Sequence, residues 1–245
     1  MTLKGLISRW PMLWKVLSIA FRSLRAGAYL REATYLKYTP QFEKVVSGRD
    51  PRRGLTVTTD ECFTIYSSIK STEKLDGSIA EVGVYKGNTA KLICGIKDER
   101  EFFLFDTFEG MPSSKITVHD DWESNTHQDT SLESVQSYLN GYSNVYFIKG
   151  EFPESIKRYP ERCLEDKRFS FVYLDVDLYT STLDGLKFFY PRLTQGGRLV
   201  SHNFNEKDNP GGRTPGVRKA FREFFAGSEH KIIEIAETQC MVIKD

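Results

Sequence analysis

Between residues 78 and 202 the chain alternates short apolar runs with amphipathic segments, and this alternation limits the fold more than any other feature. The expected strands are 78–84, 101–106, 144–149, 169–175 and 197–202, and the expected helices between them are 87–97, 131–140, 153–158 and 180–193. Such a pattern is typical of an α/β protein with a parallel sheet and right-handed crossovers. A helix at 215–226 and two strands at 230–236 and 239–244, joined by a tight turn, complete the prediction.

Length and charge limit the class of protein. A chain of 245 residues, 40% of them hydrophobic, is long enough for one α/β domain with additions. The net charge of +1 gives no global attraction to nucleic acid, so no nucleic-acid partner is expected. Four widely spaced cysteines without a C-x-x-C pair favour a reduced, cytoplasmic chain. We find no secretory signal pattern and no apolar run of the roughly 18–20 residues that span a bilayer.

The first 31 residues are basic and contain no acidic residue. Apolar residues recur at helical spacing between Met12 and Leu24, which predicts an amphipathic helix. Two interpretations stay open: peripheral contact with the inner face of a membrane through residues 1–31, or packing on the main domain or across a homo-oligomer.

Residues 37–56 are rich in proline, arginine and glycine and predict a connector. The spacing of Thr58 and Glu61 fits a capping box that opens a helix running to about Lys70. We therefore expect an N-terminal helical extension and connector at 1–53, followed by one domain at 54–245.

Two carboxylates, Asp175 and Asp177, follow the apolar run at 169–174. Ligands of open α/β sheets bind outside the carboxyl ends of the strands. Two acids are costly to desolvate there without a cation, a proton or hydrogen-bond donors. The pair indicates a metal, a proton transfer or a polar substrate; the alternative is that both acids cap the following helix.

The turn after the first strand contains Gly83 and Gly87 but lacks the G-x-G-x-x-G pattern of a dinucleotide site. Acidic Glu81 precedes these glycines, and a carboxylate repels a diphosphate but suits a cation or an ammonium group. S-adenosylmethionine carries both a sulfonium and an amino group. The turn therefore favours this cofactor, unless it is simply a connection between a strand and a helix.

About twenty residues further on, the second strand ends at Asp106. An acid at this position can accept hydrogen bonds from both ribose hydroxyls of an adenosine ligand. NAD and S-adenosylmethionine share this feature, but the missing phosphate-binding glycines fit S-adenosylmethionine alone. Glu151, after the third strand, is a weaker candidate for contact with the adenine edge.

Five segments together resemble the macrocin O-methyltransferase family, metal-dependent enzymes that methylate sugar hydroxyls. They are Glu81-Val-Gly-Val-Tyr-Lys-Gly, Phe105-Asp-Thr-Phe-Glu-Gly-Met-Pro, Lys149-Gly-Glu-Phe-Pro-Glu-Ser, Leu174-Asp-Val-Asp-Leu-Tyr-Thr-Ser-Thr and Pro215-Gly-Val-Arg-Lys-Ala-Phe. The resemblance covers roughly residues 54–244. It implies the class I methyltransferase fold, a Rossmann-like, mostly parallel sheet with an antiparallel C-terminal strand, and S-adenosylmethionine as cofactor.

The resemblance also implies roles for single residues. The expected cofactor-binding residues are Glu81, Gly83 and Tyr85 beside the methionine moiety, Asp106, Thr107 and Phe108 at the ribose, and also Gly87 and Glu151. Asp175 is the expected magnesium ligand close to the acceptor hydroxyl. Asp177 and Tyr179 are expected to shape the site of a small-molecule or glycan acceptor.

One position departs from the family pattern. After the fifth strand the family has two adjacent acids that bind the metal, whereas this chain has His202 and Asn203. Mg²⁺ prefers oxygen ligands, and imidazole suits softer metals. The candidate metal ligands are thus Asp175, His202 and Asn203. Three outcomes stay open: a weaker Mg²⁺ site that uses Asp175, Asn203, waters and the substrate; a softer metal; or no metal, with His202 as general base. Asp175 and His202 are the candidate catalytic residues.

The long polar segment 113–130 predicts an active-site lid with substrate contacts, and the loop 205–213 is also expected to face the acceptor. The predicted function is O-methylation of a sugar or other polyhydroxylated acceptor with S-adenosylmethionine. The alternative is a catalytically silent protein of the same fold that serves in binding or assembly. A NAD-dependent oxidoreductase is disfavoured by the absent glycine pattern.

Overall fold

The computed structural model describes residues 39–123, 126–204, 214–228, 231–235 and 238–245. The chain divides into two compact units, Met1–Lys44 and Val45–Asp245. The predicted helix at 12–24, the rest of residues 1–31 and the loop 205–213 lie outside the described residues, so the expectations placed on them stay predictions.

A seven-stranded sheet in the order β3-β2-β1-β4-β5-β7-β6 forms the centre of the second unit. The strands are β1 Ser78–Val82, β2 Phe102–Asp106, β3 Val145–Lys149, β4 Phe169–Leu174, β5 Leu193–Ser201, β6 Ile233–Ile235 and β7 Gln239–Ile243. Strands β1 to β5 pair in parallel, and β7 runs antiparallel to both of its neighbours. The predicted α/β class and its antiparallel C-terminal strand are confirmed.

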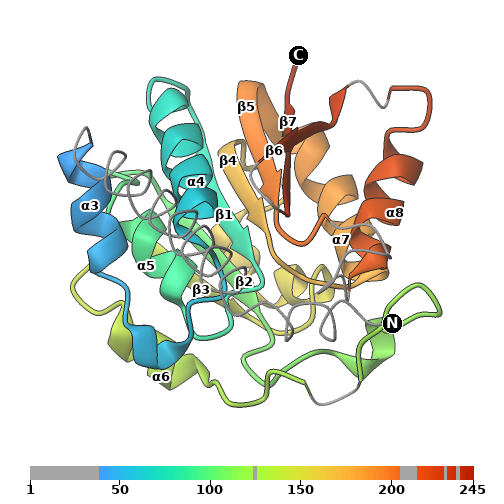
Figure 1. The fold of residues 1–245 in the computed structure, drawn as a ribbon, viewed down its shortest axis with the longest axis horizontal. Helices are drawn as coiled ribbons and strands as arrows, with labels where there is room; N and C mark the ends of the chain where they lie inside the picture. Colours follow the sequence, from blue (N-terminus) through green and yellow to red (C-terminus); the bar gives the residue numbers. More distant parts are fainter. Residues whose placement is uncertain (1–38, 124–125, 205–213, 229–230, 236–237) are drawn as a thin grey trace, which may run out of the picture. The chain divides into compact units, whose positions relative to one another are not determined.

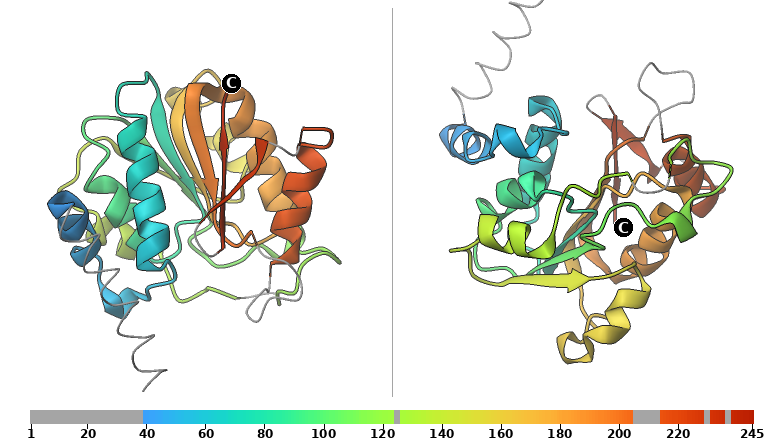
Figure 2. Two further views of the ribbon diagram at one scale, coloured as in Figure 1. Left: turned by 45° about the horizontal axis from the view of Figure 1, so that its top comes forward. Right: turned by 90° about the horizontal axis from the view of Figure 1, so that it is seen from below.

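Helices cover both faces of the sheet. They are α3 Pro40–Ser47, α4 Thr59–Ser71, α5 Asn88–Cys94, α6 Leu132–Tyr138, α7 Tyr179–Phe189 and α8 Pro215–Phe224. Helices α4, α5 and α6 lie on one face, and α7 and α8 lie on the other (Figures 1 and 2). Short 3-10 helices are η1 Pro51–Arg53, η2 Ser113–Lys115, η3 Glu154–Arg158, η4 Pro160–Arg162 and η5 Tyr190–Arg192.

Aromatic side chains fill the core between the sheet and α7. The ring of Phe189 lies 5.7 Å from that of Phe105, 5.5 Å from that of Phe152 and 5.0 Å from that of Phe169, measured between centroids. Every residue of β1 and β4 is buried. Close packing of this kind holds the carboxyl ends of the central strands in fixed positions.

The structure differs from the sequence prediction at several element boundaries; for example, β5 begins at Leu193 and not at residue 197. Segment 153–158 forms the 3-10 helix η3, because Pro160 follows too soon for a stable α-helix. The helix expected to reach residue 193 ends at Phe189, since Pro191 cannot continue it. The expected connector at 37–56 contains helix α3 and the turn η1.

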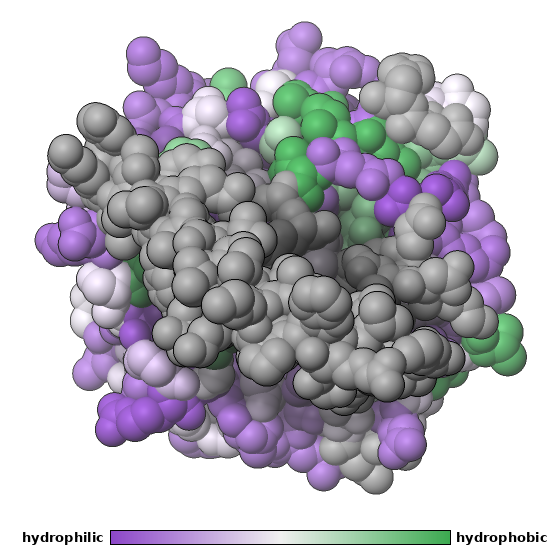
Figure 3. All heavy atoms as spheres, viewed as in Figure 1, coloured by the Kyte–Doolittle hydropathy of each residue, from purple (hydrophilic) through white to green (hydrophobic). Residues whose placement is uncertain are grey.

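On the face shown in Figure 3, the visible surface of the described residues is mainly hydrophilic. Figure 3 shows one group of hydrophobic residues over the end of the sheet that carries β6 and β7. Strand β6 has only three residues and its Ile233 is 41% exposed, as befits a short edge strand. Within the described part of the chain, no helix combines the length and the apolar character needed to cross a membrane.

Candidate functional site

The loops that follow five parallel strands surround one cavity of ≈ 390 Å³. Its lining includes Val82–Gly87 at the end of β1 and after it, Asp106 and Thr107 at the end of β2, Gly150–Phe152 after β3, Asp175–Asp177 after β4, and His202 and Asn203 after β5. The cavity therefore lies at the carboxyl edge of the sheet, where open α/β folds bind their ligands.

A carboxylate holds the β1 and β2 loops together. Asp106 Oδ2 accepts hydrogen bonds from the backbone N–H groups of Val84, at 2.6 Å, and Tyr85, at 2.8 Å. Its Oδ1 accepts from the N–H of Phe108 at 2.6 Å. A charged acceptor with three backbone donors gives a rigid turn, so Asp106 has a structural role besides its predicted contact with ribose.

Gly83 brings the β1 loop against the β4 loop. Its φ is +86°, and a Cβ atom placed on it would lie 1.9 Å from the carbonyl oxygen of Asp175. No other residue type fits this approach. The glycine of the turn thus sets the distance between the predicted cofactor region and the acidic pair.

Backbone strain collects in the loops around the cavity. Tyr85, Phe108, Asp177 and Asn203 all have φ between +50° and +60°, although none is glycine. They lie in the loops after β1, β2, β4 and β5 respectively. Residues in this region cost about 1 kcal/mol or more each and cluster at functional sites, which supports a binding role for the cavity.

Most of the predicted cofactor residues line the cavity: Gly83, Tyr85, Gly87, Asp106, Thr107 and Glu151. Phe108 is 2% exposed and is not part of the lining. Glu81 is also outside the lining and is 1% exposed. Burial, together with the carboxylates of Asp175 and Asp106, raises the pKa of Glu81 well above its ordinary value.

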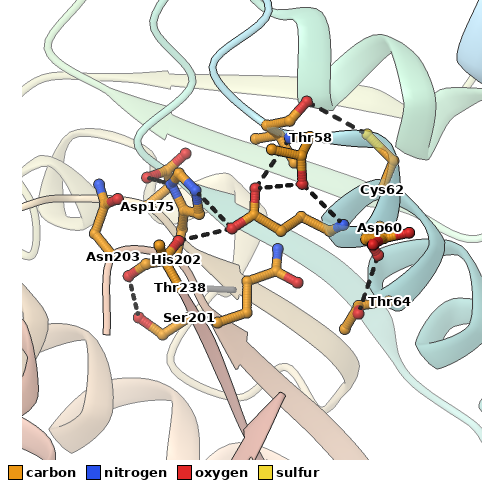
Figure 4. A network of polar contacts seen from close by, with 12 residues as sticks. Thr58, Asp60, Cys62, Thr64, Asp175, Ser201, His202, Asn203 and Thr238 are labelled. Atoms are coloured by element: carbon orange, nitrogen blue, oxygen red, sulfur yellow. Dashed lines mark hydrogen bonds and ion pairs between the residues drawn. The ribbon is translucent and has the colours of Figure 1, made fainter. Parts of the chain in front are cut away.

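Three side chains form a continuous charged network at the β4 and β5 end (Figure 4). His202 Nδ1 lies 3.0 Å from Asp175 Oδ1, and His202 Nε2 lies 3.3 Å from Glu61 Oε1. Helix α4 supplies Glu61, whose capping box with Thr58 is confirmed. Sequence reasoning assigned Glu61 only this cap and missed its contact with His202, because nothing local to the helix indicates it.

The network sets the charges of its members. Burial alone would lower the pKa of His202, but the Asp175 and Glu61 carboxylates at its two ring nitrogens raise it well above the ordinary value. Burial would raise the pKa of Glu61, yet His202, the Thr238 hydroxyl and the Thr58 N–H lower it to about 2. These opposite shifts favour an ion pair between His202 and Glu61.

Asp177 lies beside this network. Its Oδ1 accepts a hydrogen bond from the Asn203 amide, and its Oδ2 lies 3.9 Å from His127 Nε2. Burial and the charge of Asp175 raise the pKa of Asp177 to about 7. Tyr179 points elsewhere: its hydroxyl bonds to Glu223 of α8, and it is not part of the cavity lining.

Segment 113–130 contributes Trp122, His127 and Thr130 to the cavity lining. At one end of the segment, Asp120 Oδ1 accepts from the N–H of Tyr179 at 2.7 Å, at the start of α7. At the other end, Asp129 bonds to the side chains of Tyr85 and Lys86. The segment thus connects both sides of the cavity, as a predicted lid requires, and its role as a lid stays a prediction.

His202 does not fit the role of a metal ligand in this arrangement. Both of its ring nitrogens face carboxylates, so neither is directed at an open coordination position. A nitrogen that carries a proton has no lone pair for a metal. Among the described residues, no group of three His, Cys, Asp or Glu side chains is arranged to hold a metal ion.

The family model described as Macrocin-O-methyltransferase (TylF) matches residues 31–235. The chain belongs to this family. The match begins before residue 54, the start of the predicted resemblance, and includes strands β1 to β5, whose carboxyl ends surround the cavity; β7 lies beyond the match. The family resemblance predicted from the motifs is confirmed.

This chain is similar to two characterised relatives. They are mycinamicin III 3''-O-methyltransferase of Micromonospora griseorubida and a tetracenomycin rhamnosyl 4'-O-methyltransferase of Streptomyces olivaceus. The first is 29% identical over 180 residues, which cover 65% of this chain and 65% of the relative. The second is 28% identical over 143 residues, or 52% and 53% of the two chains. The matched segments thus span between about half and two thirds of these relatives' length.

Solved structures agree on the fold. The O-methyltransferase NovP aligns with a TM-score of 0.65 at 20% identity, over 87% of this chain and 99% of that chain. The calicheamicin methyltransferase CalS11 aligns with a TM-score of 0.61 at 18% identity, over 84% and 91%. The predicted methyltransferase fold is confirmed.

Proposed function

We propose that this protein transfers a methyl group from S-adenosylmethionine to a hydroxyl group of a sugar on a small glycosylated metabolite. One observation carries the proposal. The turn held by Asp106 and the acidic pair Asp175 and Asp177 line the same cavity. The residues that we assign to an adenosine ligand and those that we assign to a hydroxyl acceptor are therefore neighbours, which supports the proposal.

The residues of the β1 and β2 loops are suited to hold the cofactor. Gly83 and Gly87 leave space for close approach, and Asp106 presents carboxylate oxygens beside Thr107. Glu151, whose Oε1 accepts from the Ser114 hydroxyl at 2.5 Å, is available at the predicted adenine end. When bound, S-adenosylmethionine supplies an electrophilic methyl group on a positively charged sulfur.

The residues of the β4 and β5 loops are suited to orient the acceptor. Asp175 has an 18% exposed side chain that reaches the cavity, and Asp177 has a 13% exposed one. A sugar hydroxyl is a weak nucleophile at neutral pH, so a carboxylate that accepts its proton during the transfer assists the reaction. Relatives whose names specify sugar hydroxyls of a macrolide and of a rhamnosyl-tetracenomycin support this acceptor class.

Calorimetric titration with S-adenosylmethionine tests the first half of the proposal, with NADH as the comparison ligand. We expect saturable binding of S-adenosylmethionine alone. Transfer of a radiolabelled methyl group to glycosylated macrolides and rhamnosylated polyketides tests the second half, with the corresponding aglycones as controls. Absence of binding at millimolar S-adenosylmethionine would overturn the proposal, whereas binding without transfer to any glycoside would favour the silent alternative.

A further inference from the structure

We propose that Glu61 and His202 together replace the divalent cation of this site: they hold Asp175 by Oδ1 and leave Oδ2 to accept the proton of the acceptor hydroxyl. Asp175 is then the catalytic residue, while Glu61 is a positioning residue that acts through His202. The inference rests on the proposed function for the identity of the hydroxyl, but its geometry is independent of that identity.

The contacts of the imidazole ring carry the argument. Each ring nitrogen faces a carboxylate oxygen, Asp175 Oδ1 at 3.0 Å and Glu61 Oε1 at 3.3 Å. Two ionised carboxylates in these positions require a proton on each nitrogen, because a bare nitrogen would set its lone pair against an oxygen lone pair. The ring therefore carries a positive charge at the place expected to hold a cation.

Glu61 is fully engaged as the partner of this charge. Its Oε1 also accepts from the Thr238 hydroxyl at 2.6 Å. Its Oε2 accepts from the Thr58 N–H at 2.9 Å and the Thr58 hydroxyl at 3.0 Å. The carboxylate is 2% exposed and the His202 residue 8% exposed, so water does not compete for these bonds.

The electrostatics disfavour a second cation. One carboxylate of Asp175, one imidazolium and one carboxylate of Glu61 sum to a single negative charge. A site with three carboxylates would carry three. A divalent ion placed against Asp175 would also meet the fixed positive charge of His202 at close range, in a partly buried site where repulsion is weakly screened.

Asp175 keeps one oxygen for chemistry. Its Oδ1 is bonded to His202, and among the described residues no hydrogen bond to Oδ2 is present. In the transfer, the acceptor oxygen bonds to the methyl carbon, and the carbon–sulfur bond breaks with its electron pair going to sulfur. The hydroxyl proton moves to Asp175 Oδ2, so the positive charge on sulfur and the negative charge on the carboxylate disappear together. Release of this proton to water then restores the carboxylate.

Metal titration of the full chain tests the inference without any acceptor. Mn²⁺, as a paramagnetic stand-in for Mg²⁺, is titrated into the wild type, into His202→Asp, and into the double variant Glu61→Gln/His202→Asp, which relieves the buried carboxylate if the single variant fails to fold. We expect no saturable binding by the wild type at submillimolar Mn²⁺. The His202→Asp chain, or the double variant, should bind at least about tenfold more tightly.

NMR of the histidine rings reports the protonation of the His202 ring nitrogens. A purely structural role of Glu61 would not affect this signal. In ¹⁵N-labelled wild type we expect protons on both ring nitrogens of His202, assigned by their absence in His202→Asn. Glu61→Gln should shift the Nε2 signal, whereas Glu73→Gln, at an exposed ion pair with Lys70, should not.

Three results would overturn the inference: submillimolar Mn²⁺ binding by the wild type that Asp175→Asn abolishes, a single protonated ring nitrogen on His202, or a folded double variant that still binds no Mn²⁺. Calorimetry with S-adenosylmethionine separates this failure from that of the proposed function. If S-adenosylmethionine does not bind, the proposed function fails, but the metal titration and the NMR experiment still test the inference. If the wild type binds Mn²⁺, the inference fails, but the methyltransferase proposal is unaffected.

Discussion

At the β1 and β2 end of the cavity, one side chain accepts hydrogen bonds from the backbone of the loops. At the β4 and β5 end, charged side chains contact one another. At the first end, Asp106 accepts from three backbone N–H groups. At the other end, Asp175 bonds to His202, and His202 bonds to Glu61. The first arrangement depends on the path of the chain, and the second depends on charge.

This difference suggests how the two ends tolerate change. A cofactor shared by a whole family can be bound by backbone shape, which many sequences can form. The β4 and β5 end, which we propose to hold the acceptor, depends on paired side-chain charges, and a buried charge is costly without its partner. The replacement of two expected acids by His202 and Asn203 is balanced by such a partner, Glu61 from α4.

The largest effect is expected from Glu61→Ala, which breaks the charged end. Removing one partner of a buried ion pair leaves the His202 charge uncompensated, so the free energy of unfolding should fall by about 4 kcal/mol. Urea denaturation measures this loss. The control Glu73→Ala removes an exposed ion pair with Lys70 on the same helix region and should leave the urea midpoint nearly unchanged. Equal midpoints for both variants would contradict the network.

The dependence of stability on acidic pH tests whether Glu61 is ionised in the folded protein. The folded-state pKa of Glu61 is about 2 against an ordinary 4.5, so its contribution to stability is fully present above pH 4.5 and is lost as the pH falls through about 2. The difference in unfolding free energy between wild type and Glu61→Gln should therefore stay constant between about pH 5 and 7 and shrink below about pH 4.5. A difference that does not narrow in acid would argue against an ionised Glu61.

Gly83→Ala tests the close approach of the β1 loop to the β4 loop, where the two ends of the cavity meet. Its Cβ would lie 1.9 Å from the Asp175 carbonyl oxygen, so the loops must separate. We expect a loss of about 3 kcal/mol in unfolding free energy, from overpacking and left-handed strain together. Gly141→Ala is a matched control, because its φ is +94° with no atom within 4 Å of the added carbon. Its cost should be about 1 kcal/mol, from strain alone. Similar losses for the two variants would show that the close approach is unimportant.

How far the sequence predicts this site also differs between the two ends. Apolar runs located the parallel strands to within a few residues, because a buried strand needs a continuous apolar stretch. The polar residues just after those strands then had to meet at one edge. Gly83, Asp106 and Asp175 were found this way, and all three line the cavity.

Contacts between distant elements could not be predicted in the same way. Glu61 and His202 are far apart in sequence, and the capping box already explains a glutamate at the start of α4. Tyr179 looked like an acceptor residue by its place after Asp177. The first turn of α7 instead directs its hydroxyl to Glu223. Side-chain direction at a helix start depends on what packs against it, and that information is tertiary.

Asp106→Asn tests the backbone-held end. An amide has one acceptor oxygen, so at least one of the N–H groups of Val84, Tyr85 and Phe108 would face an NH₂ group. We expect a loss of about 2 kcal/mol in unfolding free energy and weaker binding of S-adenosylmethionine in calorimetry. Asp166→Asn, at an exposed position, is the control. Unchanged stability with weakened binding would assign Asp106 to the ligand alone.

The smallest effects concern segment 113–130, which has one anchor at each end of the cavity. Asp120 accepts from the Tyr179 N–H at the start of α7 and from the Thr117 N–H and hydroxyl, so Asp120→Ala should cost about 1 kcal/mol, as loss of a helix cap does. Asp129 bonds only to side chains of Tyr85 and Lys86 among the interactions seen, and its own side chain is 66% exposed. Asp129→Ala should therefore cost less than about 0.5 kcal/mol. Thermal unfolding of the two variants measures the difference. A larger loss for Asp129→Ala than for Asp120→Ala would mean that the segment is held mainly at the β1 end. The contrast between contacts to backbone and contacts between side chains would then not apply to this segment.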